Sequence, residues 1–555
     1  MSDSSLDTTF NDPLGYVIKK YGTAITGYSV AIDNNDRIVV TGETTDTEGK
    51  SMYTTRYLPD GKIDTSFAGG FITKQYTIGE DNVGNSVAID SEYRIIVAGY
   101  TGSTNNRDYS MFITRYLSNG TLDPSFSGGF ITKQYTPGKI TGPNSVVIDS
   151  NDNIVVTGNT IDDTDKLSMF ITRYLDNGNL DTSFGNNGVI FEQYTPGKDT
   201  YGYSVAIDIN DNIVVTGITF DNDDIGSMFI TRYLPNGKID NSFADNGVIF
   251  EQYGKNTVGR SVAIDSLGRI VVTGYTGDSD TNSSMFITRY LSNGTLDPSF
   301  PSGGFITKQY TIGGANYGQS VAIDSSDRIV VTGITGILTN LDTLSMFITR
   351  YSSNGTLDTS FSGGYITKQY TSGKGTGGSS VAIDSSNRIV VTGGTDDNTD
   401  TTSMFITRYL GTGLEPICLP AGTPILTDQG TIAIEKIDTT VHTINHRRII
   451  AVTTTITPEK NLVCFEANSM GINCPTKRTM MTPGHEVLYR GKLVQAKHFV
   501  GRVEGVHNVP YNGKDVLYNV LQEKHGLMSV NNMVLETLPP ENKVAKEILK
   551  KRYLQ

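Results

Sequence analysis

The first 417 residues of this 555-residue chain contain no cysteine and no histidine. All three cysteines and all six histidines lie in residues 418–555. The long N-terminal part therefore lacks the side chains that most often act as nucleophiles and general bases, which argues against an enzyme site there. Because the three cysteines are an odd number and form no CxxC pair, we expect no disulfide framework.

Long apolar segments are also missing. No run approaches the ~18 apolar residues of a membrane span, and the start, MSDSSLDTTFNDPLG, lacks the basic and apolar regions of a signal peptide. We therefore expect neither a transmembrane segment nor a signal peptide. Residues 1–417 hold 28 Lys and Arg against 46 Asp and Glu, a balance of −18, whereas residues 418–555 hold 17 against 12, a balance of +5. Because so acidic a body repels polyanions, we expect no nucleic-acid partner.

What residues 1–410 do contain is one pattern repeated seven times. Each SVAID or SVVID segment is followed by an IVVTG-like run, a variable polar loop, an SMFITRYL-like run, an NG turn and a GFITKQY-like run. The β-branched runs and turn residues predict four strands per unit. Units of this period are typical of four-stranded blades in a radial array. The segments begin 57 to 60 residues apart, at Ser29, Ser86, Ser145, Ser204, Ser261, Ser320 and Ser380.

The order of these strands predicts a closed ring. The first copy of the fourth strand, GYVIKKY at 15–21, precedes the first SVAID, and the last unit stops one strand short, at 404–410. Pairing the two would remove an exposed sheet edge. We therefore expect an all-β fold in which residues 1–410 form a seven-bladed β-propeller of about 28 strands, closed by the N-terminal strand.

The repeats resemble the delta-60 repeat family. Two segments carry the resemblance, TRYLPNGKIDNSFADNG at 231–247 and SVAIDSLGRIVVTG at 261–274, and it extends over residues 5–410. The family implies a propeller and no defined activity. We expect the variable loops between the second and third strands, such as TFDNDDIG, to present a binding surface for a protein or glycan ligand.

Polar residues that recur in every blade have a structural interpretation first. The Asp that ends SVAID lies at a turn, where its carboxylate satisfies backbone amides; calcium binding at DNND or DIND is the alternative. The Asn of SNGT, at Asn119, Asn293 and Asn354, fits a hairpin turn better than a glycan acceptor. One Arg per blade indicates an ion pair or carbonyl contact rather than an anion-binding ring. These are Arg56, Arg115, Arg173, Arg232, Arg289, Arg350 and Arg408.

After a short linker, GTGLEPI at 411–417, the first cysteine opens a different module. CLPAGTPILTDQGTIAIEKI at 418–437 resembles the opening block of the Hint (hedgehog/intein) fold. TPGHEVLYRGKLVQAKHFV at 482–500 is similar to its TxxH block, and DVLYNVLQEKHGLMSVNNMVLETL at 515–538 to its last strand pair. The resemblance implies a smaller, β-rich Hint domain over residues 418–540.

The resemblance also implies a chemistry and four site residues. In this family the thiol of the first cysteine, here Cys418, attacks the carbonyl of the preceding residue, Ile417, and converts that peptide bond into a thioester. His485 would donate a proton to the departing amide nitrogen, Thr482 would hold the scissile amide, and His525 occupies the position of the histidine in the last block. A second nucleophile then resolves the thioester. No cofactor is implied.

Splicing is not expected, because inteins end in His-Asn followed by Cys, Ser or Thr. VHN at 506–508 precedes the last strand pair, and the residues after Leu538 contain no His-Asn. Two residues depart from the family pattern: Ile417 is β-branched where a small residue is common, and Asn519 replaces an Asp. Both would slow cleavage at Ile417–Cys418.

The remaining candidates have structural interpretations. We interpret Cys464 and Cys474 as structural and expect no metal, since a zinc set of Cys464, Cys474, His485 and His498 matches no common spacing. Residues 541–555 read as a basic amphipathic helix that docks on the module, a membrane surface being the alternative.

Two functions remain open from the sequence. In the first, the Hint module cleaves or transfers a propeller cargo at its own N-terminus. In the second, the chain is a structural or adhesive protein with an inactive Hint domain, of the kind found on the surface of a large DNA virus, at an extracellular or virion location.

Overall fold

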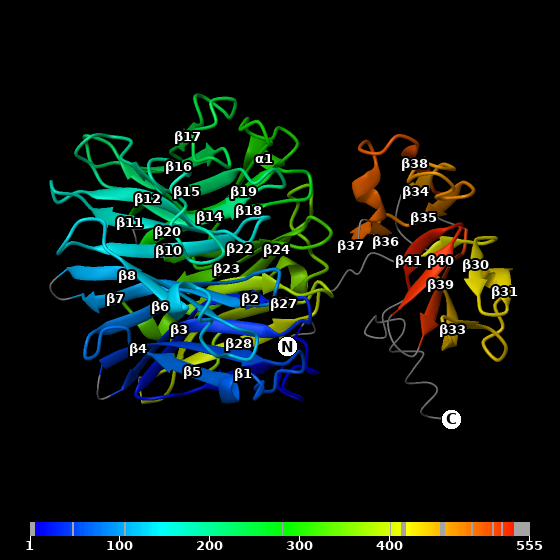
Figure 1. Ribbon diagram of the computed structural model, residues 1–555, viewed down its shortest axis with the longest axis horizontal. Coiled ribbons are helices and arrows are strands. Elements are labelled where there is room, and N and C mark those ends of the chain that lie inside the picture. Colours follow the sequence, from blue (N-terminus) through cyan, green and yellow to red (C-terminus); the bar gives the residue numbers. More distant parts are fainter. Residues whose placement is uncertain are drawn as a thin grey trace. The chain divides into compact units, whose positions relative to one another are not determined.

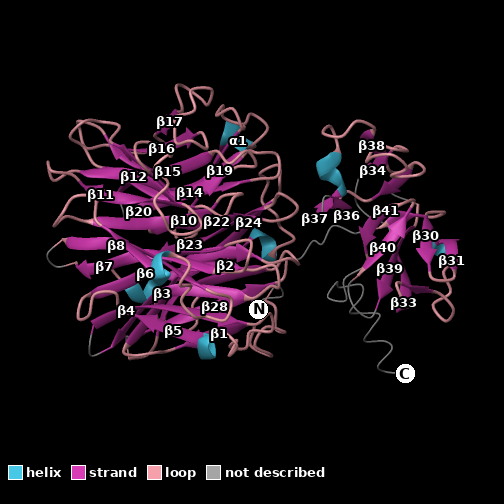
Figure 2. Cartoon of the chain, in the orientation of Figure 1, coloured by secondary structure: helices cyan, strands magenta, loops and turns pink. Residues whose placement is uncertain are grey.

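The computed structural model describes residues 6–46, 49–104, 107–279, 281–399, 401–411, 418–455, 461–489, 492–512, 515–522 and 526–537. Contacts divide the chain into two compact units, residues 1–411 and 412–555. Both consist almost entirely of strands and loops (Figures 1 and 2). The predicted all-β fold is confirmed.

The first unit is built of seven four-stranded antiparallel sheets, which we call blades 1 to 7. Blades 1 to 3 hold β2 (Ala24–Ile32), β3 (Ile38–Asp46), β4 (Gly49–Tyr57) and β5 (Phe71–Lys74); β6 (Asp81–Ile89), β7 (Ile95–Ser103), β8 (Asp108–Tyr116) and β9 (Phe130–Lys133); and β10 (Thr141–Ile148), β11 (Ile154–Ile161), β12 (Leu167–Tyr174) and β13 (Val189–Glu192).

Blades 4 and 5 are joined by one parallel bridge and hold β14 (Thr200–Ile207), β15 (Ile213–Phe220), β16 (Gly226–Tyr233) and β17 (Val248–Glu251); and β18 (Asn256–Ile264), β19 (Ile270–Ser279), β20 (Asn282–Tyr290) and β21 (Phe305–Lys308). Blades 6 and 7 hold β22 (Ala315–Ile323), β23 (Ile329–Gly336), β24 (Ser345–Tyr351) and β25 (Tyr365–Lys368); and β26 (Thr376–Ile383), β27 (Ile389–Asp396), β28 (Thr402–Tyr409) and β1 (Tyr16–Lys19). The helices of this unit are single turns: η1 (Ala68–Gly70), η2 (Ser127–Gly129), α1 (Pro301–Gly304), η3 (Leu341–Thr343) and η4 (Ser362–Gly364).

The N-terminal strand closes this unit, as predicted. Strand β1 pairs antiparallel with β28, with Val17 opposite Ile406. On the inner side, the first strands of successive blades contact one another from β2 to β26, and β26 contacts β2. One hydrogen bond repeats at each of these contacts: the amide of Val87 donates to Ser29 Oγ at 3.2 Å, and around the ring the amide of Val30 donates to Ser380 Oγ at 3.2 Å. The Ser and Val of each SVAID segment therefore link one blade to the next.

The glycine of IVVTG is explained by the innermost strand of the same blade. A β-bulge between Gly27 and Ser29 directs the carbonyl of Thr26 at Gly42. A Cβ built on Gly42 would lie 1.9 Å from that oxygen, closer than any side chain tolerates. The equivalent contact recurs in the other blades, for example 1.8 Å between a Cβ on Gly274 and the carbonyl oxygen of Val258. Steric exclusion therefore accounts for this glycine in every repeat.

The recurring arginine joins blades through a buried ion pair. Arg56 is 1% exposed, its Nε lies 2.7 Å from Asp64 Oδ2, and its Nη1 donates to the carbonyl of Ser118 in the next blade at 2.6 Å. Its guanidinium also lies 4.7 Å from the centre of the Phe67 ring. The interpretation as an ion pair and carbonyl contact is therefore confirmed for Arg56. In blade 7 the pair is completed by the N-terminal segment, since Arg408 Nε lies 2.9 Å from Asp7 Oδ2.

The second unit contains three sheets, with strand orders β29-β39-β33-β32, β31-β30-β40-β41-β36-β37 and β35-β34-β38. Their strands are β29 (Leu419–Pro420), β30 (Pro424–Thr427), β31 (Gly430–Ala433), β32 (Thr443–Ile444), β33 (Arg447–Thr455), β34 (Asn461–Phe465), β35 (Thr479–Met481), β36 (Glu486–Tyr489), β37 (Lys492–Gln495), β38 (Val506–Pro510), β39 (Leu517–Gln522), β40 (Leu527–Val530) and β41 (Met533–Glu536), with the short helices η5 (Ile434–Lys436) and η6 (Ala496–Phe499). A large hydrophobic core, which includes Ile425, Val463 and Val520, draws on all three sheets.

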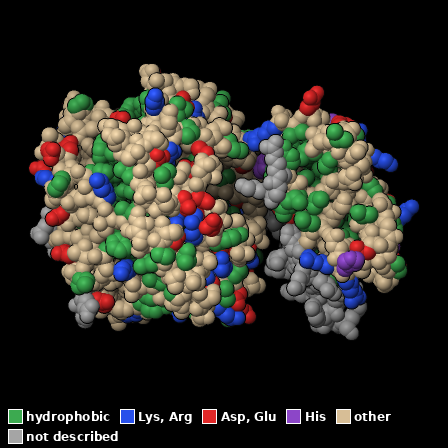
Figure 3. Space-filling view, in the orientation of Figure 1, with side chains coloured by type: hydrophobic (Ala, Val, Ile, Leu, Met, Phe, Trp, Pro, Cys, Tyr) green, Lys and Arg blue, Asp and Glu red, His purple; other side chains and the backbone are tan. Residues whose placement is uncertain are grey.

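Two predicted segments fall largely or wholly outside the described residues. These are the linker, of which only Gly411 is described, and the C-terminal helix at 541–555. In the described part of the chain, no helix is long and apolar enough to cross a membrane. In the view of Figure 3, acidic and basic side chains are interspersed over residues 1–411 and do not gather by sign.

Candidate functional site

Cys418 lies at the start of the second unit, one residue before β29. Strand β29 pairs antiparallel with β39, with Leu419 opposite Tyr518 and Pro420 opposite Leu517. The Cys418 side chain is buried and packs with Leu462 and Leu517. This burial raises the pKa of the thiol to about 12, so the group is protonated at neutral pH. A nucleophilic role for Cys418 therefore requires a group that removes this proton.

Thr482 holds the backbone of Cys418 from both sides. The amide of Cys418 donates to Thr482 Oγ1 at 2.8 Å, and the amide of Thr482 donates to the carbonyl of Cys418 at 2.9 Å. Thr482 is fully buried and directly follows β35, which pairs with β34 in the sheet next to Cys418. Its hydroxyl thus contacts the nitrogen that would leave if the Ile417–Cys418 bond broke. The structure therefore brings Cys418 and Thr482, two of the predicted site residues, into direct contact.

His485 ends the turn that Thr482 begins. The turn is closed by the His485 amide, which donates to the carbonyl of Thr482 at 3.1 Å, and the His485 carbonyl accepts from Ala496 at 2.8 Å. The imidazole is fully buried, and neither ring nitrogen hydrogen-bonds to any residue that the structure describes. Burial lowers the pKa of His485 to about 4, although the carboxylate of Glu536 opposes the shift. The imidazole is therefore neutral at physiological pH.

This protonation state changes the role expected for His485. The sequence predicted that His485 donates a proton to the departing amide nitrogen, but an imidazole with a pKa near 4 is not in its charged, proton-donating form at neutral pH. A neutral imidazole is instead suited to accept a proton first. It would act as the donor only after taking the thiol proton, as a general base that becomes a general acid.

His525 and Ile417 lie outside the described residues, so the structure places neither side chain. The backbone next to His525 is well held: the Gly526 amide donates to Thr537 Oγ1 at 3.0 Å, and the Thr537 amide donates to the Gly526 carbonyl at 2.8 Å. Thr537 belongs to the VLETL segment, so this segment holds the backbone of Gly526 in place.

Asn519 is a neighbour of Cys418 that was not among the predicted site residues. Extending the β29–β39 register by one residue places Asn519 opposite Cys418. The side chain is fully buried, and its Oδ1 accepts a hydrogen bond from the Val520 amide at 2.7 Å. The signal in the sequence was the substitution of Asn for the family Asp. The sequence showed only that Asn519 replaces the family Asp, whereas the extended strand pairing places this residue opposite Cys418.

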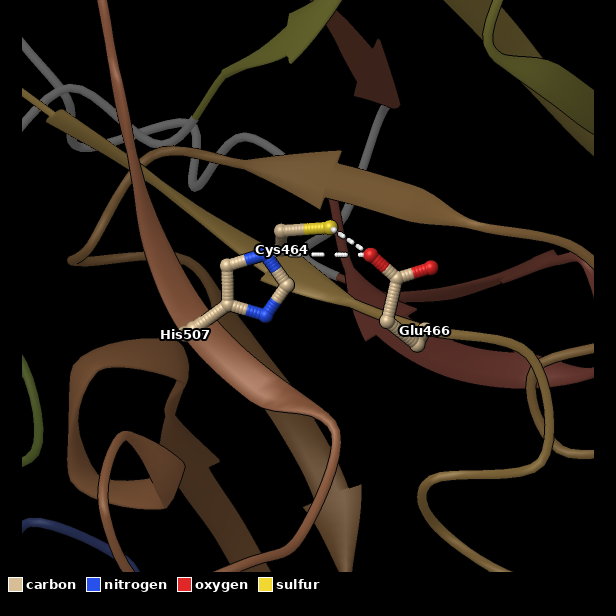
Figure 4. Close-up of side chains that lie close together, drawn as sticks. All are labelled: Cys464, Glu466 and His507. Carbon is tan, nitrogen blue, oxygen red and sulfur yellow. Dashed lines mark hydrogen bonds and ion pairs between the residues drawn. The ribbon is translucent and has the colours of Figure 1, made fainter.

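The structure does not assemble the zinc set of Cys464, Cys474, His485 and His498. Among the described residues, the one group of three possible metal ligands with converging atoms is a different one, Cys464, Glu466 and His507 (Figure 4). Cys474 Sγ instead lies 3.5 Å from the carbonyl oxygen of Asn532. All three cysteines are free thiols.

The recurring acids and amides of the first unit serve turns, as interpreted. Asp33 Oδ1 accepts from the amides of Asn35 and Arg37, both at 2.9 Å, and Asp208 does the same in blade 4. Asn119 Oδ1 accepts from the Thr121 amide at 3.0 Å. In each of these groups a side-chain oxygen accepts hydrogen bonds from nearby backbone amides, which is the structural role that the turn interpretation gave them.

Comparison with known proteins agrees with this division. A family model described as a Hint domain matches residues 417–542. A second, described as a domain of unknown function (DUF5122) beta-propeller, matches residues 34–67, 94–126, 210–243 and 268–300. No curated protein matches the chain.

Solved structures resemble the chain only distantly. An ulvan lyase, a polysaccharide lyase, is 11% identical with a TM-score of 0.42, covering 72% of this chain and 95% of its own. A protein of unknown function from Dyadobacter fermentans is 11% identical with a TM-score of 0.37, covering 72% and 98%. Sqt1 from Chaetomium thermophilum is 12% identical with a TM-score of 0.35, covering 71% and 100%. At this distance none of them informs function. The chain thus contains a repeat region, within residues 34–300, that matches the DUF5122 beta-propeller model, and a C-terminal region, residues 417–542, that matches the Hint domain model.

Proposed function

We propose that the Hint domain cleaves its own chain at Ile417–Cys418, or transfers the preceding segment, by an N–S acyl shift. One observation carries the proposal: Thr482 Oγ1 accepts a hydrogen bond from the Cys418 amide at 2.8 Å. The lone pair of an amide nitrogen is delocalised into its carbonyl, so the nitrogen becomes a leaving group only when it is held out of conjugation and protonated. A buried hydroxyl that accepts from this nitrogen fixes the position of the scissile amide, which supports a positioning role for Thr482.

The buried groups suggest a sequence of proton transfers. The neutral imidazole of His485 takes the proton of the Cys418 thiol, and the thiolate adds to the Ile417 carbonyl carbon. The resulting imidazolium then protonates the Cys418 nitrogen as the C–N bond breaks, leaving a thioester and a free amine. The thiol proton ends on the amine, so the step needs no external acid or base. Water, a thiol or another nucleophile then opens the thioester.

The alternative is that the Hint domain only packs and does not react. Two observations favour it: the Cys418 thiol, with a pKa near 12, is strongly protonated, and neither ring nitrogen of His485 hydrogen-bonds to a described residue. The presence of Asn519 in place of the family Asp also favours a Hint domain that does not react. In that case the chain would serve as a structural or adhesive protein.

One experiment separates the two. The purified chain is incubated with and without dithiothreitol and with hydroxylamine, and its intact mass is followed over days. Self-processing predicts fragments of residues 1–417 and 418–555, with the first fragment modified by the nucleophile. Cys418→Ala must abolish them, whereas Cys474→Ala, a matched change of a cysteine distant in sequence, must not. A chain that stays whole with every nucleophile would establish the packing role.

For the first unit we propose a binding role centred on the innermost strands. The residue before each SVAID segment varies among the blades, being Tyr, Asn, Arg, Gln or Ser, while its neighbours largely repeat. In blade 5 it is Arg260, whose guanidinium lies 4.4 Å from the ring centre of Tyr203 and 5.6 Å from that of Tyr275. Half-buried aromatic rings with one cation suit a polar ligand such as an oligosaccharide or a peptide.

A panel of immobilised oligosaccharides and peptides tests this role. Retention that is lost in Arg260→Gln and Tyr203→Ala, but kept in Arg37→Gln, would support it. The control, Arg37, lies in a turn and pairs with Asp33. Retention that all three variants share would show that the innermost strands are not the binding surface.

A further inference from the structure

A cluster of three side chains in the second unit lies outside the Cys418 site and combines one buried residue, Cys464, with two that are partly or fully exposed, Glu466 and His507. Strands β34 and β38 pair antiparallel with Cys464 directly opposite His507, and Glu466 follows the end of β34. Figure 4 shows the three side chains converging from these two strands. Cys464 Sγ lies 3.5 Å from Glu466 Oε1, which in turn lies 3.7 Å from His507 Nε2.

The donor set and its spacing match a zinc site. Thiolate sulfur, imidazole nitrogen and carboxylate oxygen are the ligands that zinc takes in proteins, at about 2.3, 2.0 and 2.1 Å. A tetrahedron with those bond lengths has ligand-to-ligand edges of about 3.3–3.6 Å. The sulfur-to-oxygen edge, 3.5 Å, already lies in this range, the oxygen-to-nitrogen edge, 3.7 Å, is slightly longer, and all three donor atoms lie within 4.8 Å of one another. Because the Glu466 and His507 side chains are 43% and 50% exposed, they have room for the remaining adjustment.

The positively charged side chain of Arg478 already contacts two members of this cluster. Arg478 Nε lies 3.1 Å from Cys464 Sγ and 3.4 Å from Glu466 Oε1, on the loop that precedes β35. The side chain is 53% exposed, so it can swing into solvent at little cost. Its position shows that the Glu466 carboxylate attracts positive charge to a place beside the Cys464 sulfur. A divalent ion would replace one monovalent contact with three direct bonds.

We propose that Cys464, Glu466 and His507 bind one zinc ion, with a fourth position left to water and with Arg478 displaced when the metal enters. Binding would release the thiol proton of Cys464, so the affinity would rise with pH. The proposal is independent of self-cleavage, because neither Cys418 nor His485 takes part.

Titration of the full chain with zinc chloride, under a non-thiol reductant, tests the site. We expect one ion per chain, proton release on binding, and affinity weakened by more than about tenfold in Cys464→Ser, His507→Ala and Glu466→Gln. Cys474→Ser is the matched cysteine control and Cys418→Ala removes the other buried thiol; both should bind as the parent does. Arg478→Met should bind more tightly, because it removes the competing cation.

Cobalt binding gives a spectroscopic signal that a purely structural role of these three residues would not produce. Co²⁺ bound through Cys464 gives a sulfur-to-metal charge-transfer band, which Cys464→Ser abolishes and Cys474→Ser retains. Glu466 and His507 lie at the surface, so their variants should fold even if Cys464→Ser does not. Absence of stoichiometric binding, or binding that survives both His507→Ala and Glu466→Gln, would overturn the proposal.

Discussion

The hydroxyl of Thr482 accepts a hydrogen bond from the backbone amide of Cys418, and the amide of Thr482 returns one to the carbonyl of Cys418. These two residues are 64 positions apart in the sequence, yet they exchange hydrogen bonds as residues on paired strands do. The first of these bonds ends on the nitrogen of the Ile417–Cys418 peptide. The geometry around that one atom decides whether this Hint domain can process its own chain.

Replacing Thr482 should slow thiol-induced cleavage while leaving the fold intact. Thr482→Val keeps the shape and removes the hydroxyl, and we expect a loss of about 10²-fold in rate, as for removal of one positioned group at a reacting centre. Thr482→Ser keeps the hydroxyl and should retain most of the rate. The first-order appearance of the 418–555 fragment, followed by mass spectrometry, measures both. Equal rates in Val and Ser variants would show that the hydroxyl has no part in the reaction.

Cleavage should be lost in acid with the titration of His485. If the neutral imidazole takes the thiol proton, the cleavage rate falls as the pH drops through about 4, the pKa of His485. Between that pH and neutrality, His485 causes no further change in the rate. A direct donor would instead need the charged form and would lose activity as pH rises above that value. Initial rates between pH 3.5 and about 8 separate the two roles.

His485 should also make the second unit sensitive to acid. Its pKa falls from 6.5 when unfolded to about 4 when buried, so the unfolded chain binds more protons between those values. Stability is therefore complete above pH 6.5 and decreases as pH falls toward 4, by at most about 1.4 kcal/mol per pH unit. Hydrogen exchange of β34 and β39 in the full chain measures this. His485→Gln should give a flatter profile, and an unchanged slope would contradict the assignment.

Asn519→Asp should restore part of the family pattern. The residue lies opposite Cys418 in the extended register, so an acid there would add a proton acceptor beside the thiol. We expect a several-fold faster cleavage in Asn519→Asp and no gain in Asn519→Ala. Since the site is fully buried, thermal unfolding of each variant must accompany the rates. A slower reaction in a folded Asp variant would rule out this role.

Asp7→Asn should loosen the closure of the ring. It leaves the buried Arg408 without its carboxylate, and breaking such a pair costs about 3–5 kcal/mol. Faster hydrogen exchange should appear in β1 and β28. Asp64→Asn, which breaks the same pair inside blade 1, is the matched control: it should destabilise the unit without selectively freeing β1. Identical exchange patterns in the two variants would show that the N-terminal segment is not the closing element.

Acid should affect the same closure. Burial alone would raise the pKa of Asp7, but the Thr9 hydroxyl and Arg408 together hold it below the usual value of 3.8. The carboxylate thus stabilises the ring fully above pH 3.8, and this contribution is lost as pH falls further. Exchange of β1 at pH 3 against pH 5 measures the loss, which Asp7→Asn should abolish.

The repeated pattern was enough to predict most of the first unit. Strand content, the turn role of Asp33 and the pairing of the N-terminal strand all follow from local periodicity and from one strand missing at the end. These properties depend on residues that are close together in the sequence or on the order of the repeats, so the sequence alone determines them. The ordered motifs likewise named Cys418, Thr482 and His485 as candidate site residues, and hydrogen bonds in the structure join the first two of them.

What the tertiary structure decided depends on burial and on cross-strand register. The imidazole of His485 is neutral because the folded core removes its water, which no local pattern records. His507 lies opposite Cys464, and the extended β29–β39 register places Asn519 opposite Cys418, only because strands distant in sequence pair in one register. The bond from Arg56 to the next blade is of the same kind. Sequence therefore determined which groups are present, and long-range packing determined their protonation and their partners.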